Sequence, residues 1–148
     1  MMRQEKIFRW TIEYDREATI EAYNAIDRFV GCTCDYCENF RVVQSQLPKT
    51  YFSLLDKLGI DPDKVAESAH FNKTKNGMHL YGWWFHIVGQ VIYGGTDFIL
   101  LSEDEGSKIE MVLRNRRDVV PTTFPQNLIQ IDFFSELPWG IEKPEPEE

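Results

Sequence analysis

Apolar residues change their spacing near residue 68, and this change limits the possible folds more than any other property of the sequence. From Asp15 to that point they recur at steps of three and four positions, which places them on one face of an α-helix. After it they alternate with polar residues or form short aromatic runs, which is typical of β-strands. At 148 residues, the chain is long enough for one domain with an ordinary core.

Three longer helices and one short helix are predicted in the first part of the chain. The first follows Asp15, a predicted N-cap, and ends at Gly31. The second begins at Asp35, where the sequence DYCE is close to a capping box. The third ends at Gly59, a typical helix stop. A short helix is predicted at residues 61–64, where Asp precedes Pro in the sequence DPDK.

Strands are predicted on both sides of the helices. The sequence FRWTIEYD alternates as a half-buried strand does, and Asn76-Gly77 predicts a hairpin between two aromatic-rich runs. The predicted fold class is α+β: an N-terminal strand and a helical block of three to four helices pack on a C-terminal antiparallel sheet. Residues 1–141 are predicted to form this single domain, and residues 142–148, EKPEPEE, an acidic disordered tail.

The charge and hydropathy of the chain disfavour two classes of partner. Its formal net charge of −8 at pH 7 repels phosphate backbones, so we expect no nucleic-acid partner. No apolar run reaches the roughly 18 residues that a membrane span needs, so we expect no membrane partner either. The N-terminus lacks the apolar core of a signal peptide. We therefore expect a cytoplasmic protein whose thiols are kept reduced.

All three cysteines of the chain lie within one short stretch, GCTCDYCENF, as Cys32, Cys34 and Cys37. This stretch includes the predicted start of a helix, where exposed N–H groups and the helix dipole favour thiolate over thiol. Thiolate is the form that binds zinc, and a tight cluster in a reducing compartment is typical of a metal site. Cys32, Cys34 and Cys37 are therefore predicted metal ligands, with zinc as the expected ion.

A fourth zinc ligand would have to come from another part of the chain. The three histidines, His70, His79 and His86, all lie in the β part, so a histidine ligand would tie the helical block to the sheet. His79 and His86 are seven positions apart and face opposite sides of an unbroken strand. We expect His70 or His79, and the sequence does not decide between them.

Three other interpretations of the cysteines stay open. A thiol redox enzyme would use the pair Cys34 and Cys37, although thioredoxin-like CxxC motifs follow a strand in a βαβ unit that this chain lacks. An iron–sulfur cluster normally takes four cysteines. The third interpretation is that the cysteines are inert and pack a corner between helices.

The run MHLYGWWFHIVGQVIYGG suggests a second candidate site. A small ligand could stack on Trp83 or Trp84 in a pocket on the sheet, with His86 as a polar contact or general base. The alternative is that these aromatic residues are the core of the sheet under the helices.

Three segments, CTCDYCENF, LGIDPDK and GWWFHIVG, resemble a family of short bacterial proteins with no assigned activity. The resemblance implies a bacterial cytosolic origin and nothing about catalysis, and no functional residues are carried over from it. We expect a small, non-enzymatic binding or interaction domain with a Cys-ligated structural zinc and a protein or small-molecule partner. The alternatives are the redox enzyme and the ligand pocket around Trp83 and His86.

Overall fold

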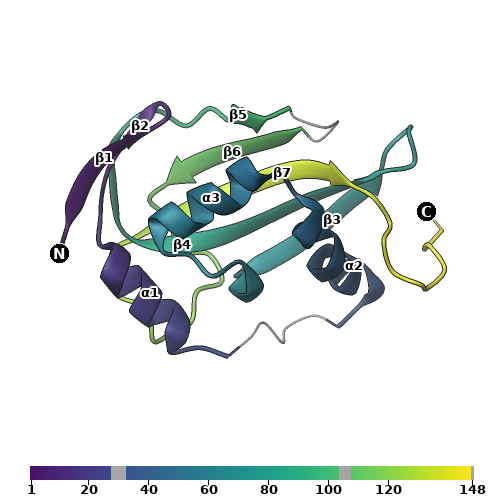
Figure 1. Cartoon of the computed structure of the whole chain (residues 1–148), viewed down its shortest axis with the longest axis horizontal. Coiled ribbons are helices and arrows are strands. Elements are labelled where there is room, and N and C mark those ends of the chain that lie inside the picture. The colour runs from purple at the N-terminus through teal and green to yellow at the C-terminus, as the bar shows by residue number, and fades with distance from the viewer. Residues whose placement is uncertain (28–32, 104–107, 148) are drawn as a thin grey trace.

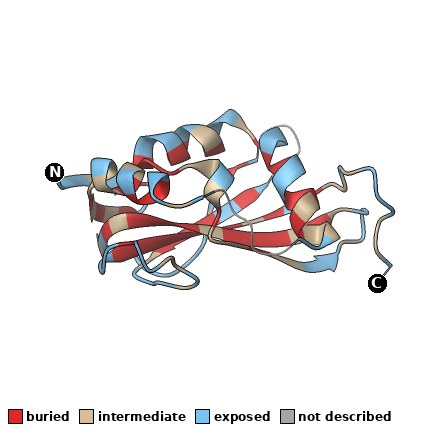
Figure 2. Ribbon diagram, turned by 90° about the horizontal axis from the view of Figure 1, so that it is seen from below, coloured by how far each residue is buried: buried red, intermediate tan, exposed pale blue. Residues whose placement is uncertain are grey.

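The computed structural model describes residues 1–27, 33–103 and 108–147. Over these residues the chain forms a seven-stranded sheet, and three α-helices lie on one of its faces. Figure 2 shows the two layers edge-on, with the buried residues of the helices turned towards the sheet. The strand order is β1-β2-β4-β7-β6-β5, and β3 also pairs with β4. All the pairings are antiparallel.

The long strand β4, His79–Tyr93, is the centre of the sheet. One edge of β4 pairs with β7, Leu128–Leu137, along most of its length. The other edge is shared between two strands. Its first half pairs with β3, Glu67–Lys73, and its last residues pair with β2, Trp10–Tyr14. The outer strands are β1, Arg3–Ile7, on one side and β6, Ile109–Arg114, with β5, Ile99–Ser102, on the other.

The predicted division into a helical block and a C-terminal sheet is wrong. The N-terminal residues form a hairpin, β1 and β2, that belongs to the same sheet as the C-terminal strands. The reason is the length of β4, which extends beyond β3 and β7 and therefore needs another partner for residues 89–93. The hairpin supplies it, with Tyr14 paired to Gly89 and Thr11 to Tyr93.

The helices are α1, Arg16–Asn24, α2, Asp35–Val43, and α3, Lys49–Leu58, and α1 ends several residues before its predicted stop. Two 3₁₀ turns, Gln44–Gln46 and Pro62–Lys64, follow α2 and α3.

Three of the predicted helix ends are confirmed, but the predicted cap of one of them is not. The Asp15 side chain accepts a hydrogen bond from the Ala18 N–H at 2.9 Å, and Gly59 ends α3 with a left-handed φ of 82°. The second helix does begin at Asp35, but its N-cap is Cys34, which makes no side-chain capping bond. The predicted stop at Gly31 lies outside the described residues.

The main core lies between the helices and the odd-numbered residues of β4. Tyr81, Trp83, Phe85 and Ile87 are all at most 1% exposed. Trp83 lies at the centre: its ring packs on Phe40 of α2 and Phe133 of β7, and its indole N–H donates to the Tyr51 hydroxyl at 2.9 Å. Burial raises the pKa of Tyr51, so this hydroxyl stays protonated.

Side chains of α1 satisfy the edge of β4 between its two partner strands. The Tyr23 hydroxyl accepts from the His86 N–H at 2.9 Å and donates to the His86 carbonyl at 2.8 Å. Next to it, Thr19 Oγ1 accepts from the Val88 N–H at 3.0 Å. Burial raises the pKa of Tyr23, which keeps its donor proton in place. Helix α1 therefore takes the place of a strand over this short gap.

None of the described helices has the length and apolarity needed to span a membrane.

Candidate functional site

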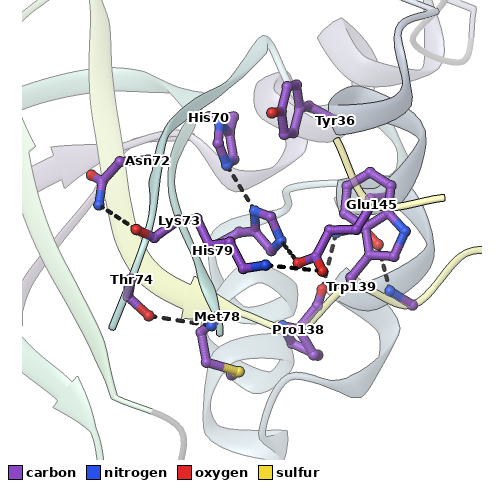
Figure 3. Close-up of polar contacts among 12 residues, drawn as sticks. Tyr36, His70, Asn72, Lys73, Thr74, Met78, His79, Pro138, Trp139 and Glu145 are labelled. Atoms are coloured by element: carbon purple, nitrogen blue, oxygen red, sulfur yellow. Dashed lines mark hydrogen bonds and ion pairs between the residues drawn. The ribbon is translucent and has the colours of Figure 1, made fainter. Parts of the chain in front are cut away.

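The first turn of α2 lies against the hairpin formed by β3 and β4. Cys34 is exposed at the N-cap and Cys37 is buried one turn later, with its Sγ 3.9 Å from Ser68 Oγ on β3. Between the two cysteines, the Tyr36 ring stacks on the His70 ring with centroids 3.8 Å apart. Figure 3 shows Tyr36, His70, His79 and the C-terminal segment around this point. The predicted ligand His70 therefore lies beside the turn that carries Cys34 and Cys37.

Three side chains form a continuous hydrogen-bonded chain at this site. His70 Nε2 lies 2.9 Å from His79 Nδ1, and His79 Nε2 lies 2.5 Å from Glu145 Oε1. The His79 side chain is 0% exposed, while His70 is half-buried. The second oxygen of Glu145 pairs with Lys73 Nζ at 3.1 Å. Hydrogen bonds from His79 and then Lys73 hold the pKa of Glu145 below its usual range, so it is a carboxylate.

The carboxylate determines the tautomers of both histidines. A carboxylate only accepts, so the hydrogen in its bond to His79 is on His79 Nε2. When His79 is neutral, its Nδ1 is an acceptor, and the hydrogen of the next bond is on His70 Nε2. The lone pair of a neutral His70 is then on Nδ1. Glu145 thus sets the form of a histidine that it does not touch.

Tyr81 connects the cysteines to this chain. Its hydroxyl donates to the Tyr36 carbonyl at 2.8 Å, and its ring lies 5.3 Å from the His70 ring. Burial raises the pKa of Tyr81 to about 12, with smaller contributions that include both Cys37 and Cys34.

The structure describes two of the three predicted cysteine ligands, Cys34 and Cys37. Cys32 lies outside the described residues. Among residues 1–27, 33–103 and 108–147, no three His, Cys, Asp or Glu side chains are arranged to hold a metal ion. The residues near the first turn of α2 nevertheless have the right chemistry, because two thiols and one imidazole are ligands that Zn²⁺ prefers. A complete site would need a further ligand beside Cys34, Cys37 and His70.

The aromatic run does not form the predicted pocket around Trp83 and His86. Trp83 pairs with Phe133 and points into the core, whereas His86 pairs with Gln130 on the opposite face of the sheet. Their separation by an odd number of residues on one strand is the reason. Trp84 does share the face of His86, and its indole N–H donates to the Asp118 carbonyl at 3.1 Å.

A buried polar network occupies this second face of the sheet. His86 Nε2 bonds Gln130 Oε1 at 3.2 Å, Gln130 bonds Asp132 at 2.9 Å, and Asp132 pairs with Arg114 at 2.6 Å. Gln130 Oε1 also accepts from the Asp118 N–H, which ties the loop after β6 to the sheet. Each of these contacts satisfies a group that would be costly to bury alone. The network explains why His86, Gln130 and Asp132 are buried.

His86 makes the stability of the protein depend on pH. Burial lowers its pKa more than Gln130, Asp132 and Asp118 raise it. As the pH falls below the ordinary imidazole value of about 6.5, the unfolded chain binds a proton that folded His86 resists. The contribution of neutral His86 is therefore complete above that value and is lost progressively below it.

We expect the free energy of unfolding to fall between a pH of about 7.5 and about 5.5, and to fall less in His86→Gln. The glutamine does not titrate and keeps a donor for Gln130. Urea unfolding of both proteins at the two pH values measures the difference. Equal losses in the two proteins would assign the pH dependence to other groups.

The same face carries an exposed aromatic strip made of Phe71, Phe98 and Phe134. Phe71 stacks on Phe134 with centroids 5.6 Å apart, and Phe98 meets Phe134 edge-on at 5.2 Å. Phe71 is 53% exposed and Phe98 39%. Gly82 makes room for the strip, because a Cβ there would lie 2.6 Å from the Phe134 ring.

Comparison with known proteins adds nothing to this geometry, since no family model, curated protein or solved structure matches the chain. The resemblance to short bacterial proteins stays a prediction. Sequence reasoning did not find Glu145, Tyr36 or Tyr81 as residues of the site. The composition of residues 142–148 predicts a disordered tail that includes Glu145. Only its contact with His79 in the folded protein distinguishes Glu145 from the other acidic residues near the C-terminus.

Proposed function

We propose that this protein is a small, non-enzymatic binding domain in which a zinc ion joins α2 to the β3–β4 hairpin. Cys34, Cys37 and His70 would be ligands, and Cys32 would complete a tetrahedral set. The metal would act in folding, because the binding energy of a structural site is folding energy. The partner would be a protein or a small molecule.

The observation that carries the zinc proposal is the position of His70. It comes from a strand 33 positions after Cys37 in the sequence, yet its ring stacks on Tyr36, the residue immediately before Cys37. Metal-bound histidines usually donate their other ring N–H to a partner that fixes their orientation. His70 Nε2 has such a partner in His79, which is itself held by Glu145. A metal would then be bound through His70 Nδ1.

The aromatic strip supports the binding part of the proposal. Contiguous exposed apolar surface on a soluble protein is typical of interaction sites. Two exposed carboxylates share the face of the strip: Glu110 is paired with Phe134, and Glu136 lies two residues further along β7. Such a surface favours a partner that offers basic side chains next to apolar ones.

Elemental analysis tests the zinc proposal. We expect about one zinc per chain in protein expressed with zinc and purified without chelator. Cys37→Ser and His70→Ala should lose most of this metal, because each removes one ligand. His86→Gln is the matched control: it changes a buried histidine of β4 on the other face of the sheet, and it should keep its zinc. Wild-type protein without stoichiometric metal would refute the proposal.

A redox enzyme is the second candidate, favoured by the exposure of Cys34 at the start of a helix next to buried Cys37. Exposed N–H groups at a helix start stabilise a thiolate, which is the attacking form in thiol exchange. The same samples separate the two candidates. Metal-free protein in which Cys34 reacts with iodoacetamide faster than free cysteine would favour the redox enzyme, and zinc-bound protein with protected thiols would favour the binding domain.

A further inference from the structure

The loop after β6 and the start of β7 form a pocket beside the part of β4 that extends beyond β7. The pairing of β4 with β7 ends at Val88, and the Gly89 N–H donates to the Asn127 carbonyl at 3.0 Å. Further along β4, the Asn115 side chain accepts from the Val91 N–H at 2.7 Å and donates to the Val91 carbonyl at 3.1 Å. The pocket lined by these segments has a volume of about 270 Å³.

Positive and neutral polar side chains line this pocket. Arg116 and Arg117 contribute two guanidinium groups, and Gln90, Gln126 and Asn127 contribute amides. None of the described residues that line it is acidic, although the chain as a whole has a formal net charge of −8. A smaller pocket between α1 and α3, in contrast, has two aspartates in its wall. The pocket beside β4 is therefore a place where an acidic protein presents positive charge.

The loop after β6 holds both guanidinium groups in position. Arg117 Nη1 donates to the Pro125 carbonyl at 2.5 Å and to the Gln126 carbonyl at 2.7 Å. These two bonds use two of the five N–H groups of the guanidinium and leave three for another acceptor. Arg116 Nη2 lies 2.8 Å from the Asp118 carboxylate, in an ion pair that is about half exposed. Both arginines therefore keep N–H donors for a ligand in the pocket.

The residue after the two arginines, Asp118, fixes the loop to the sheet. Its N–H donates to Gln130 Oε1 at 3.0 Å, its carboxylate accepts from Gln130 Nε2 at 3.2 Å, and its carbonyl accepts from the Trp84 indole. Next to it, Val119 has a φ of 49°, a left-handed conformation that is costly for a β-branched side chain. Such strain persists where the surrounding structure holds the backbone, and it is concentrated at ligand sites.

We propose that this pocket binds a small phosphate monoester through Arg116 and Arg117. The planar guanidinium presents pairs of N–H groups that match two oxygens of one phosphate group. Two adjacent guanidinium groups suit the double negative charge of a phosphate monoester better than the single charge of a carboxylate. The amides of Gln90, Gln126 and Asn127 both donate and accept, so they suit hydroxyl groups next to the phosphate.

The charge of the rest of the chain restricts the size of the ligand. A long phosphate backbone would extend beyond the two arginines and meet an acidic protein, so a nucleic acid is disfavoured. A ligand with one phosphate group fits within the pocket and avoids this repulsion. The inference goes beyond the proposed function and does not depend on the zinc site, because none of the pocket residues is a proposed metal ligand.

An NMR titration of the whole chain with glycerol 2-phosphate tests the inference. We expect saturable shifts of the N–H signals of Arg116, Arg117 and Asn127, weaker binding of acetate, and no shifts with glycerol. Arg116→Gln should weaken the binding of glycerol 2-phosphate about 10-fold or more, because it removes a charged donor. Arg116→Lys should recover part of this loss, since it keeps the charge but not the paired N–H groups.

The variant Arg3→Gln is the matched control. Arg3 forms a similarly exposed ion pair with Glu17 at 3.2 Å on β1, and it does not line the pocket. Its loss removes the same charge from the protein and should leave the affinity nearly unchanged. The unfolding temperature of Arg116→Gln should match that of the wild type, because an exposed pair contributes little to stability.

Three results would overturn the inference. The first is a wild-type titration whose shifts do not saturate. The second is equal affinity for glycerol 2-phosphate in wild type and Arg116→Gln. The third is an equal loss of affinity in Arg3→Gln and Arg116→Gln, which would assign the binding to the overall charge of the protein. Equal affinity for acetate and glycerol 2-phosphate would overturn the choice of a phosphate ligand.

Discussion

Replacing Trp83 with alanine is expected to lower the free energy of unfolding by about 3–5 kcal/mol, the usual cost of deleting a large aromatic side chain from a core. Trp83 is 0% exposed and packs on Phe40 and Phe133, so its removal leaves a cavity between α2 and the sheet. It also leaves the Tyr51 hydroxyl without the indole donor that it has in the wild type. Urea unfolding at neutral pH measures the loss.

The neighbouring tryptophan provides the matched control. Trp84 is half-buried on the opposite face, where it contacts the loop after β6, so Trp84→Ala should cost only about 1–2 kcal/mol. The two variants delete the same atoms from adjacent positions of one strand. Equal losses would mean that the helices do not cover the face of the sheet that carries Trp83.

Replacing Gly89 with alanine is expected to cost about 2–5 kcal/mol, from backbone strain together with a steric clash. Its φ of 152° is a conformation that L side chains rarely adopt. A Cβ would lie 2.1 Å from the Glu13 carbonyl oxygen and 2.7 Å from the Tyr14 Cα, both backbone atoms of β2. The strand must therefore move away from β4, which would weaken the attachment of the N-terminal hairpin to the sheet.

The variant Gly77→Ala separates the cost of backbone strain from the cost of a steric clash. Gly77 also has a positive φ, 78°, but a Cβ there would meet nothing within 4 Å. Gly77→Ala should therefore cost only about 1 kcal/mol, the penalty for a left-handed backbone without a collision. Hydrogen exchange measures the effect locally. In Gly89→Ala the amides of β1 and β2 should exchange faster than in the wild type, while the amides of the other strands should not. If Gly89→Ala costs no more than Gly77→Ala, the backbone of β2 does not lie as close to Gly89 as the structure indicates.

Local sequence patterns predicted the helix-forming segments and most strands, but not which strands share one sheet. β1 contains Arg3, Gln4, Glu5 and Lys6, and it has no apolar alternation because it is an outer strand exposed on both faces. It is joined to the sheet by its pairing with β2. The pairing of β2 with β4 depends on how far β4 extends past its other neighbours, and no local pattern reports that length.

The candidate site was predictable only where its residues have distinctive chemistry. Cysteine and histidine are rare enough in this chain that Cys34, Cys37 and His70 could be selected from the sequence. Glu145 is one of many acidic residues, and its contact with His79 joins positions 66 apart. The pattern EKPEPEE describes the solvation of that segment but contains no information on which carboxylate meets a histidine.

The central strand β4 has consequences for how the chain is made. Its last residues pair with the N-terminal hairpin, and its first residue, His79, contacts Glu145 near the C-terminus. In Figure 1 the two ends of the chain accordingly lie at opposite ends of the molecule. The strand between them has no complete set of partners until β7 and Glu145 have been synthesised. During translation the first 100 residues therefore leave the ribosome with apolar strand surface uncovered, and the sheet closes only after β7 has been synthesised.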